Sequence, residues 1–250
     1  MKYFLTFFIS YQSLFSQGWP GSACTESQNN KVKKWYNSGK IGEFGLGLGD
    51  GIWWGPQISS SYLKAEGIPP KIDPEPHIGS QDYDRWTCMY SAHSAIGKNN
   101  KTAWCEGKDY DGEGEIIIFS APINDKFQIR NGVSLNSKKF SENNRIKELE
   151  IKLFLGKNCN YTTLGNDALY GFVCKESIEI AKSTTTLLDI IEWQELRLPN
   201  IYKYKIPSNN IGPFGTYNTF IGLKILSVYP GTRFRDTCIS GIEWPIRNEK

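Results

Sequence analysis

Hydrophobic and polar residues alternate with a period of two in much of the chain after residue 85, a pattern typical of β-strands. The clearest segment is RIKELEIKLFL (145–155). Aliphatic residues share one of its faces and charged residues take the other: Leu149, Ile151, Leu153 and Leu155 against Glu148, Glu150 and Lys152. The pattern predicts a strand with one face in a core.

The other predicted strands are short segments rich in β-branched and aromatic residues. They are EIIIF (115–119), FQIRNG (127–132), YGFVCKESIEIA (170–181), TTTLLDIIEWQELRLP (184–199), TFIGLKILSVYPG (219–231) and TCISGIEW (237–244). Turn-forming residues separate them, and FQIRNG ends at Asn-Gly, a common hairpin turn. Few segments show a helical period. We therefore expect an all-β fold, an antiparallel β-sandwich or jelly roll.

Residues 18–84 have a different character. The segment GIPPKIDPEPHIGS (67–80) is rich in Pro and Gly, which excludes a helix or a central strand there. We expect an irregular N-terminal extension or linker of unknown role. The glycine-rich GLGLGDG (45–51) lacks the Lys-Ser/Thr ending of a phosphate loop, so we interpret it as a turn.

The first 17 residues are typical of a signal peptide. Lys2 precedes an apolar run, Tyr3 to Phe15, which is too short to span a bilayer as a helix. A buried N-terminal strand or helix is the alternative. We expect a secreted, cell-surface or periplasmic protein without a transmembrane segment, and whether it is released or anchored is left open.

Six cysteines in an exported chain favour disulfides. Cys159 and Cys174 flank a short loop and are the first predicted pair, and Cys88 with Cys105 is the second. Free buried thiols are the alternative for several of them. There is no Cys-x-x-Cys, and the chain has two histidines, so a zinc site has little support.

Charge and motifs exclude several functions. The chain has 29 basic and 26 acidic residues, a net charge of +3, which does not predict nucleic-acid binding. Neither Gly-x-Ser-x-Gly nor His-Glu-x-x-His is present. We therefore expect a protein that is not an enzyme.

The dense acidic segment EGKDYDGEGE (106–115) has three interpretations. Its carboxylates suggest glycoside hydrolysis, but no second carboxylate segment faces them. Alternatively, Asp109 and Asp111 are ligands of a structural calcium, although the segment does not match an EF-hand loop. The favoured interpretation is a turn, with Gly112 and Gly114 at positive φ, that leads into the strand 115–119. Trp104 would then pack in the core.

Four segments in this order resemble a known family. They are KTAWCEGKDYDGEGEIIIF, FQIRNG, KFSENNRIKELEI and ILSVYPGTRFRDTCISGIEW. The chain resembles the NADase-type glycan-binding domain, a discoidin-like, galactose-binding-like jelly roll of secreted bacterial proteins, over residues 85–246. The resemblance implies glycan binding without catalysis. Cys105 and Cys238 depart from the family pattern, which suggests an extra disulfide or two free thiols.

Candidate ligand residues gather in the polar loop 131–145. Sugar hydroxyls call for amide and guanidinium groups, and an aromatic ring suits the apolar sugar face. The candidates are Asn131, Asn143, Asn144 and Arg145, with Trp86, Trp53 or Trp54 as the aromatic plate. The alternatives are that these asparagines satisfy turn backbone, that Arg145 forms a buried ion pair supporting the loop, and that Trp53 and Trp54 pack the extension on the sandwich.

These observations predict an exported carbohydrate-binding protein that recognises a glycan or glycoprotein through loops at one end of a β-sandwich. It needs no cofactor other than the structural calcium considered above. Two alternatives stay open. One is a protein-binding module that uses the same loops, and the other is an enzyme whose activity lies in residues 18–84 or in the acidic turn.

Overall fold

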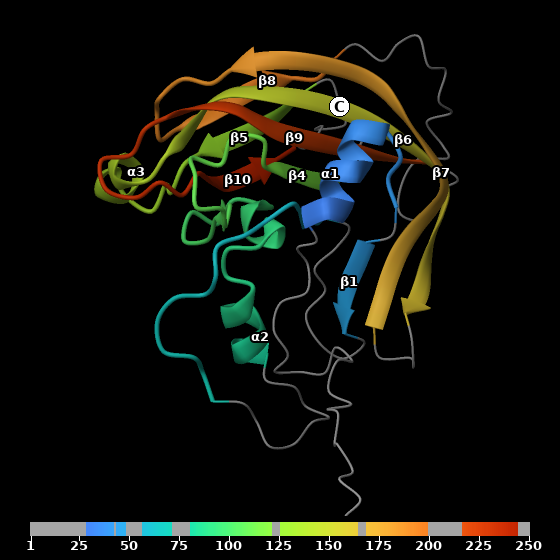
Figure 1. Ribbon diagram of the computed structural model, residues 1–250, viewed down its shortest axis with the longest axis horizontal. Coiled ribbons are helices and arrows are strands. Elements are labelled where there is room, and N and C mark those ends of the chain that lie inside the picture. The colour runs from blue at the N-terminus through green and yellow to red at the C-terminus, as the bar shows by residue number, and fades with distance from the viewer. Residues whose placement is uncertain are drawn as a thin grey trace, which may run out of the picture.

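The chain folds into two antiparallel β-sheets with a few short helices (Figure 1). A computed structural model describes residues 29–42, 44–48, 57–71, 81–121, 126–164, 169–199 and 217–244. The predicted signal peptide, Cys24, Trp53 and Trp54 lie outside these residues. The predicted discoidin-like β-sandwich is confirmed.

The larger sheet has six strands among the described residues. In spatial order they are β1 (Phe44–Leu48), β7 (Leu169–Thr186), β6 (Arg145–Leu164), β9 (Tyr217–Tyr229), β4 (Ile116–Ala121) and β2 (Gln57–Ser59). The second sheet consists of β3 (Trp104–Cys105), β10 (Cys238–Glu243), β5 (Lys126–Asn131) and β8 (Trp193–Arg197). The helices are α1 (Asn29–Ser38), α2 (Gln81–Thr87), the 3-10 helix η1 (Ala92–Ala95) and α3 (Ser137–Glu142).

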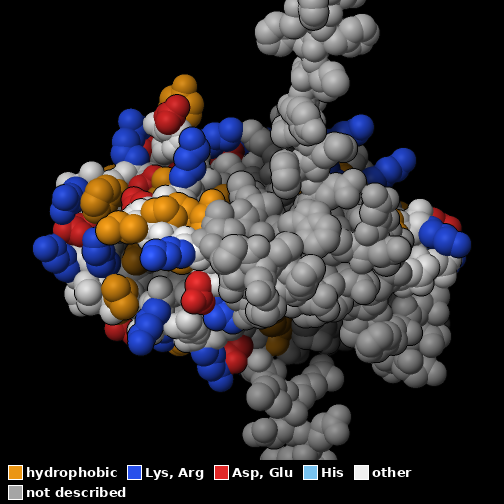
Figure 2. Space-filling view, turned by 90° about the horizontal axis from the view of Figure 1, so that it is seen from below, with side chains coloured by type: hydrophobic (Ala, Val, Ile, Leu, Met, Phe, Trp, Pro, Cys, Tyr) orange, Lys and Arg blue, Asp and Glu red, His pale blue; other side chains and the backbone are white. Residues whose placement is uncertain are grey.

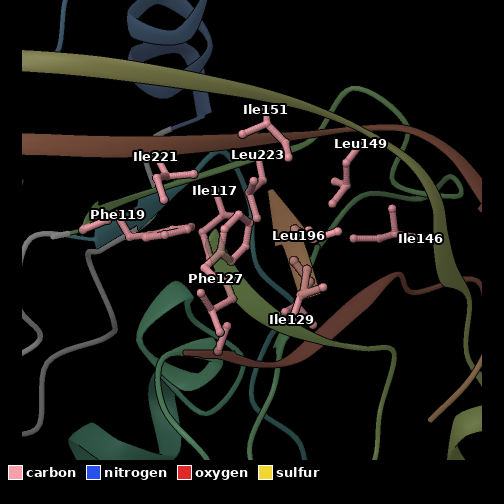
Figure 3. Close-up of a cluster of buried hydrophobic side chains, with 14 of the residues drawn as sticks. Ile117, Phe119, Phe127, Ile129, Ile146, Leu149, Ile151, Leu196, Ile221 and Leu223 are labelled. Carbon is pink, nitrogen blue, oxygen red and sulfur yellow. The ribbon is translucent and has the colours of Figure 1, made fainter. Parts of the chain in front are cut away.

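The main core lies between the two sheets (Figure 3). The predicted face of β6 supplies Leu149, Ile151 and Leu153, which are all buried there. The opposite sheet contributes Phe127 and other inward residues at every second position. Alternation of side chains along a strand therefore places the apolar residues on the inner face, as the sequence pattern indicates.

The outer face of the six-stranded sheet is also covered, by helix α1 (Figure 1). Val32, Trp35 and Tyr36 are spaced as one apolar stripe of a helix, and all three are buried. They pack on outward residues of the sheet such as Ile118 and Phe154. This second core explains why EIIIF is apolar at consecutive positions: β4 is buried on both faces.

The extension before residue 85 is thus partly ordered and joined to the sandwich. β1 pairs with β7, and β2 pairs with β4. The segment 57–61 then runs beside the start of β4, where Ser60 N donates to Ile116 O at 2.8 Å. Described parts of the extension, including 29–38 and 57–59, therefore share a core with the domain that follows.

Two disulfides join pairs of cysteines within the described residues. Cys159–Cys174 joins facing residues of β6 and β7, so this predicted pair is confirmed. The predicted pair Cys88–Cys105 is wrong, because Cys105 bonds Cys238, which lies opposite it in the β3–β10 ladder with a Cα–Cα distance of 4.1 Å. Cys88, at the end of α2, is also disulfide-bonded. The extra disulfide suggested by Cys105 and Cys238 is therefore present.

These bridges bear on the cellular compartment. Disulfides persist in oxidising environments and are rare in the cytosol, so they indicate an extracellular or secreted protein. In the described part of the chain, no helix is long and apolar enough to cross a membrane.

Candidate functional site at the loop end

Four connecting segments meet at one end of the sandwich, which we call the loop end. They are the acidic turn 106–115, the α3 loop 132–144, the β7–β8 connection 187–192 and the β9–β10 connection 230–237. The strand directions bring them together, since β9 runs into this end and β10 runs out of it. In Figure 1 this end lies at the left, around α3.

Polar contacts tie three of these segments into one unit. The Arg235 guanidinium donates from Nε to Asp111 Oδ1 at 2.8 Å, and Thr237 Oγ1 donates to Asp111 O at 2.7 Å. Asn144 bridges the α3 loop to the β9–β10 connection, because its Nδ2 donates to Arg235 O at 2.7 Å and its Oδ1 accepts from Gly231 N at 2.6 Å. The loop end is therefore internally cross-linked.

Two more of the predicted ligand residues satisfy backbone groups. Asn131 is fully buried, with Nδ2 donating to Ile146 O at 2.8 Å and Oδ1 accepting from Ile146 N at 2.9 Å. Asn143 donates from Nδ2 to Lys139 O at 2.9 Å and so closes the α3 turn. Asn131 thus satisfies backbone of strand β6, and Asn143 satisfies backbone of the α3 turn.

Arg145 forms the ion pair that the sequence analysis kept as an alternative. Nε and Nη2 donate to the two carboxylate oxygens of Asp189 at 2.8 and 2.7 Å, and Nη1 donates to Asn143 O and Pro230 O. The side chain is 9% exposed. With Asn144 also at 2% exposure, the loop residues predicted to bind ligand lie inside and hold the loops in position.

Other side chains form the surface of the loop end. Basic, acidic and hydrophobic groups lie side by side at the left of the space-filling view, the end at which α3 lies (Figure 2). The exposed hydrophobic residues are Tyr110, Leu135 and Leu188. The exposed basic residues are Lys138, Lys139, Arg233 and Arg235. These groups can contact a ligand without rearrangement of the loops.

Trp86 does not join this surface. It lies on α2, where Nε1 donates to Glu66 O at 2.9 Å and the ring packs 5.7 Å from that of Tyr83. In Figure 1, α2 lies well away from α3. The predicted aromatic plate and the predicted polar loop are therefore on different parts of the molecule.

The acidic turn is a structural element, as favoured from the sequence. Gly112 and Gly114 adopt φ of 76° and 85°, values that a residue with a Cβ rarely takes. Trp104, just before the turn, is fully buried, and its Nε1 donates to Ser61 O at 2.9 Å. The turn thus connects two core strands.

Asp109 and Asp111, the predicted calcium ligands, both lie in the acidic turn. Within the described ranges, no three His, Cys, Asp or Glu side chains converge as metal ligands. Asp111 is paired with Arg235, and this hydrogen bond holds the pKa of the Asp111 carboxyl below its usual range. A calcium ion at Asp111 would compete with the exposed Arg235 guanidinium for the same carboxylate.

Two carboxylates of the turn are buried in different environments. Burial raises the pKa of Glu106 to about 7, although Lys108 N and Thr237 N donate to it. Glu115 accepts from Lys33 Nζ at 2.6 Å and from two serine hydroxyls. Burial raises the pKa of Glu115, but these donors outweigh it and hold the value below the usual range.

Divergent carboxyl pKa values often mark an acid–base pair. Here Glu106 is 0% exposed and Glu115 is 2% exposed, so neither meets a substrate in this structure. Both carboxylates act within the fold: Glu106 accepts from turn backbone, and Glu115 joins α1 to the start of β4.

Comparison with known proteins agrees with this architecture. The model of the family described as NAD glycohydrolase translocation F5/8 type C domain matches residues 77–245, which cover both sheets apart from β1 and β2. The chain belongs to this family. The F5/8 type C domain thus begins before residue 85 and includes helix α2 and the whole loop end.

Two solved structures share weak likeness with the F5/8 type C protein. One is the arabinofuranosyltransferase AftD from Mycobacteria, with 10% identity and a TM-score of 0.35 over 74% of this chain and 13% of that one. The other is a Ruminococcus gnavus GH29 fucosidase in complex with fucose, with 13% identity and a TM-score of 0.26 over 75% of this chain and 24% of that one. The chain thus spans a small part of either protein. A comparison with curated proteins yields no match.

Two residues of the β9–β10 connection, the exposed Arg233 and the half-buried Phe234, were not predicted from the sequence. Arg233 and Phe234 stand in YPGTRFRD (229–236), where two arginines flank an aromatic ring just after a Pro-Gly turn. An arginine–aromatic cluster in a loop is a binding signal, and it was available from the sequence.

Proposed function

We propose that the protein is an exported, non-catalytic carbohydrate-binding protein whose F5/8 type C domain recognises a glycan or glycoprotein with the loop end. One observation carries the proposal: two cations lie over the half-buried Phe234 ring on a cross-linked surface. The Arg233 guanidinium lies 4.8 Å and the Lys139 ammonium 5.7 Å from the ring centroid. An aromatic ring with hydrogen-bond donors beside it suits a sugar, which has an apolar face and hydroxyl edges.

Pre-organisation supports this function. Phe234 N and Arg233 N donate to Glu142 O at 2.8 and 3.1 Å, and Thr232 N donates to Ser141 O at 3.0 Å. The backbone from Thr232 to Phe234 is thereby fixed to the end of α3. A ligand binding here would not need to order the loop first, which lowers the entropic cost of binding.

In this proposal Asn131, Asn143, Asn144 and Arg145 act indirectly, as residues that position the binding loops. Their replacement is expected to weaken binding together with stability. Replacement of the exposed Arg233 is expected to weaken binding alone. This difference separates positioning residues from contact residues.

A glycan-array screen of the purified protein, with and without calcium, tests the proposal. We expect selective binding that falls at least about tenfold in Phe234→Ala, which is about 1.4 kcal/mol. Lys126→Ala is the matched control, because Lys126 is an exposed cation on β5 that pairs with Glu195 away from α3. Absence of binding by a folded protein, or equal loss in both variants, would contradict the proposal.

A protein ligand is the second candidate, favoured by the exposed hydrophobic residues of the same end. Tyr110 and Leu188, on two connections of this end, are 74% and 63% exposed, and exposed apolar side chains are available to a protein partner. A glycoprotein that carries a glycan selected on the array should be tested for binding before and after enzymatic removal of its glycans. Binding that survives removal supports the protein-binding alternative.

A further inference from the structure

A buried carboxylate at the loop end is surrounded by more positive charge than it neutralises. Glu142 lies 3.9 Å from Lys138 Nζ, 3.7 Å from Lys139 Nζ and 3.7 Å from Arg233 Nη1. Three cations thus share one anion. We call Lys138, Lys139, Glu142, Arg233 and Phe234 the Glu142 cluster.

The cations of the Glu142 cluster keep their hydrogen-bond donors available. Their distances to the carboxylate, 3.7 to 3.9 Å, exceed those of N–H···O hydrogen bonds. Glu142 Oε2 is buried and has no hydrogen-bond partner among the described residues. The side chains of Lys138 and Arg233 are 79% and 64% exposed, so an external ligand can reach them.

Two acidic groups of the loop end, Asp111 and Asp189, are already paired with other arginines. Asp111 is paired with Arg235 at 2.8 Å, and Asp189 is paired with Arg145 at 2.7 Å. The Glu142 cluster has two cations more than anions. Its positive charge lies around an aromatic ring, as described for Phe234 above.

We infer that the loop end recognises glycans that carry an acidic group, a carboxylate or a sulfate ester. Lys138, Lys139 and Arg233 pair with the acidic group, and Phe234 packs against the sugar ring. This inference rests on the proposed carbohydrate-binding function and adds the class of ligand. Arg and Lys form strong charge-assisted hydrogen bonds with such oxyanions, and a preference for charge is sensitive to salt.

Matched pairs of glycans test the inference. The first pair is a sialylated glycan and its desialylated parent, and the second is a sulfated glycan and its unsulfated parent. We expect the acidic member of at least one pair to bind roughly tenfold more tightly at low salt, with the preference reduced at high salt. The pair that shows the preference identifies carboxylate or sulfate as the preferred group.

Variants assign the preference to the cluster. Lys138→Gln and Arg233→Gln should each reduce the preference for the acidic glycan about threefold or more while the neutral parent still binds. Glu142→Gln removes the central anion and keeps its shape, so it should increase the preference. Lys126→Gln is the control, since it removes an exposed cation outside the cluster and should leave the preference unchanged.

The outcomes separate this inference from the proposed function. Equal binding of acidic and neutral glycans would overturn the inference and leave carbohydrate binding in place. A preference that persists in both the Lys138 and Arg233 variants would also overturn it. No binding to any glycan would overturn both. Binding to anionic phospholipid vesicles, but not to soluble acidic glycans, would assign the cluster to a membrane headgroup and overturn the inference.

Discussion

The Arg145 guanidinium contacts both carboxylate oxygens of Asp189, a residue 44 positions later in the chain. The pair fastens the β7–β8 connection to the first residue of β6, and Nη1 of the same arginine donates to Pro230 O at 2.9 Å. One side chain therefore holds three parts of the loop end. This arrangement makes the loop end a rigid frame for the exposed residues around Phe234.

Breaking this pair should destabilise the protein. Asp189→Asn removes the charge that balances a guanidinium of 9% exposure, and we expect a loss of roughly 2 kcal/mol in the free energy of unfolding. Urea unfolding provides the measurement. Lys126→Ala, which breaks the exposed Lys126–Glu195 pair, should cost under about 0.5 kcal/mol. Similar losses in both variants would count against a structural role for Arg145.

Glu106 should make stability depend on pH. Its pKa is raised from 4.5 to about 7 by burial, so it favours folding most at low pH, and this contribution is lost as pH rises through about 7. Glu106→Gln removes the titration. The free energy of unfolding of the variant, relative to that of wild type, should therefore increase from pH 5 to pH 8, by on the order of 2 kcal/mol.

Urea unfolding of wild type and variant at both pH values checks the sign. The comparison isolates Glu106, because the other titrating groups are present in both proteins, among them Asp111 and Glu150 with lowered pKa values and Asp236 with a raised pKa. A stability difference that does not change with pH would contradict the assignment.

Helix α1 should be an integral part of the domain. Tyr36 is fully buried against the outer face of the six-stranded sheet, and its hydroxyl donates to Glu150 O at 3.2 Å. Tyr36→Ala is expected to cost about 3 to 4 kcal/mol through the cavity that it leaves. Ile68→Ala, at a residue of 94% exposure, should have almost no effect. If Tyr36→Ala left the free energy of unfolding unchanged, α1 would not be an integral part of the fold.

The two disulfides should contribute unequally. Cys105–Cys238 closes a loop of 133 residues and Cys159–Cys174 one of 15 residues. In the chain-entropy account, removal by paired Cys→Ser changes should cost about 4 to 5 kcal/mol for the first and about 3 kcal/mol for the second. Thermal unfolding of the two double variants shows which disulfide contributes more to stability. The reverse order would argue against loop entropy as the source of the stabilisation.

Calcium should not stabilise the protein. Since Asp111 is already paired with Arg235, we expect the same melting temperature with millimolar calcium and with a chelator. A calcium-dependent rise that disappears in Asp109→Asn would restore the calcium interpretation of the acidic turn. Asp82→Asn, at an exposed acid on α2, serves as the control.

Much of the fold could be predicted from the sequence because it depends on local alternation. The inner face of β6 and the turn at Gly112 follow from residue type and spacing alone. Helix α1 could not be recognised, because its apolar stripe is short and the helix is stabilised mainly by packing against a distant sheet face. The pairing of Cys105 with Cys238 depends on strand register across 133 residues, which the sequence does not display.

The candidate site was harder to predict for a different reason. Asn131, Asn144 and Arg145 have the chemistry that sugars need, but the same groups satisfy loop backbone equally well. Which of these roles an amide takes depends on the direction of its side chain in the folded loops. The exposed fraction of the side chain separates the two roles: Asn131, Asn144 and Arg145 are buried, whereas Arg233 is exposed.

The most direct test of the central claim is an NMR titration of the isotope-labelled protein with a glycan selected on the array. The account predicts that the largest backbone amide shifts lie in residues 231–235 and 138–142, and that Phe234→Ala needs at least about ten times more glycan to produce them. Shifts that centre on α2 and Trp86, or on the outer surface of β8, would show that the loop end is not the binding site.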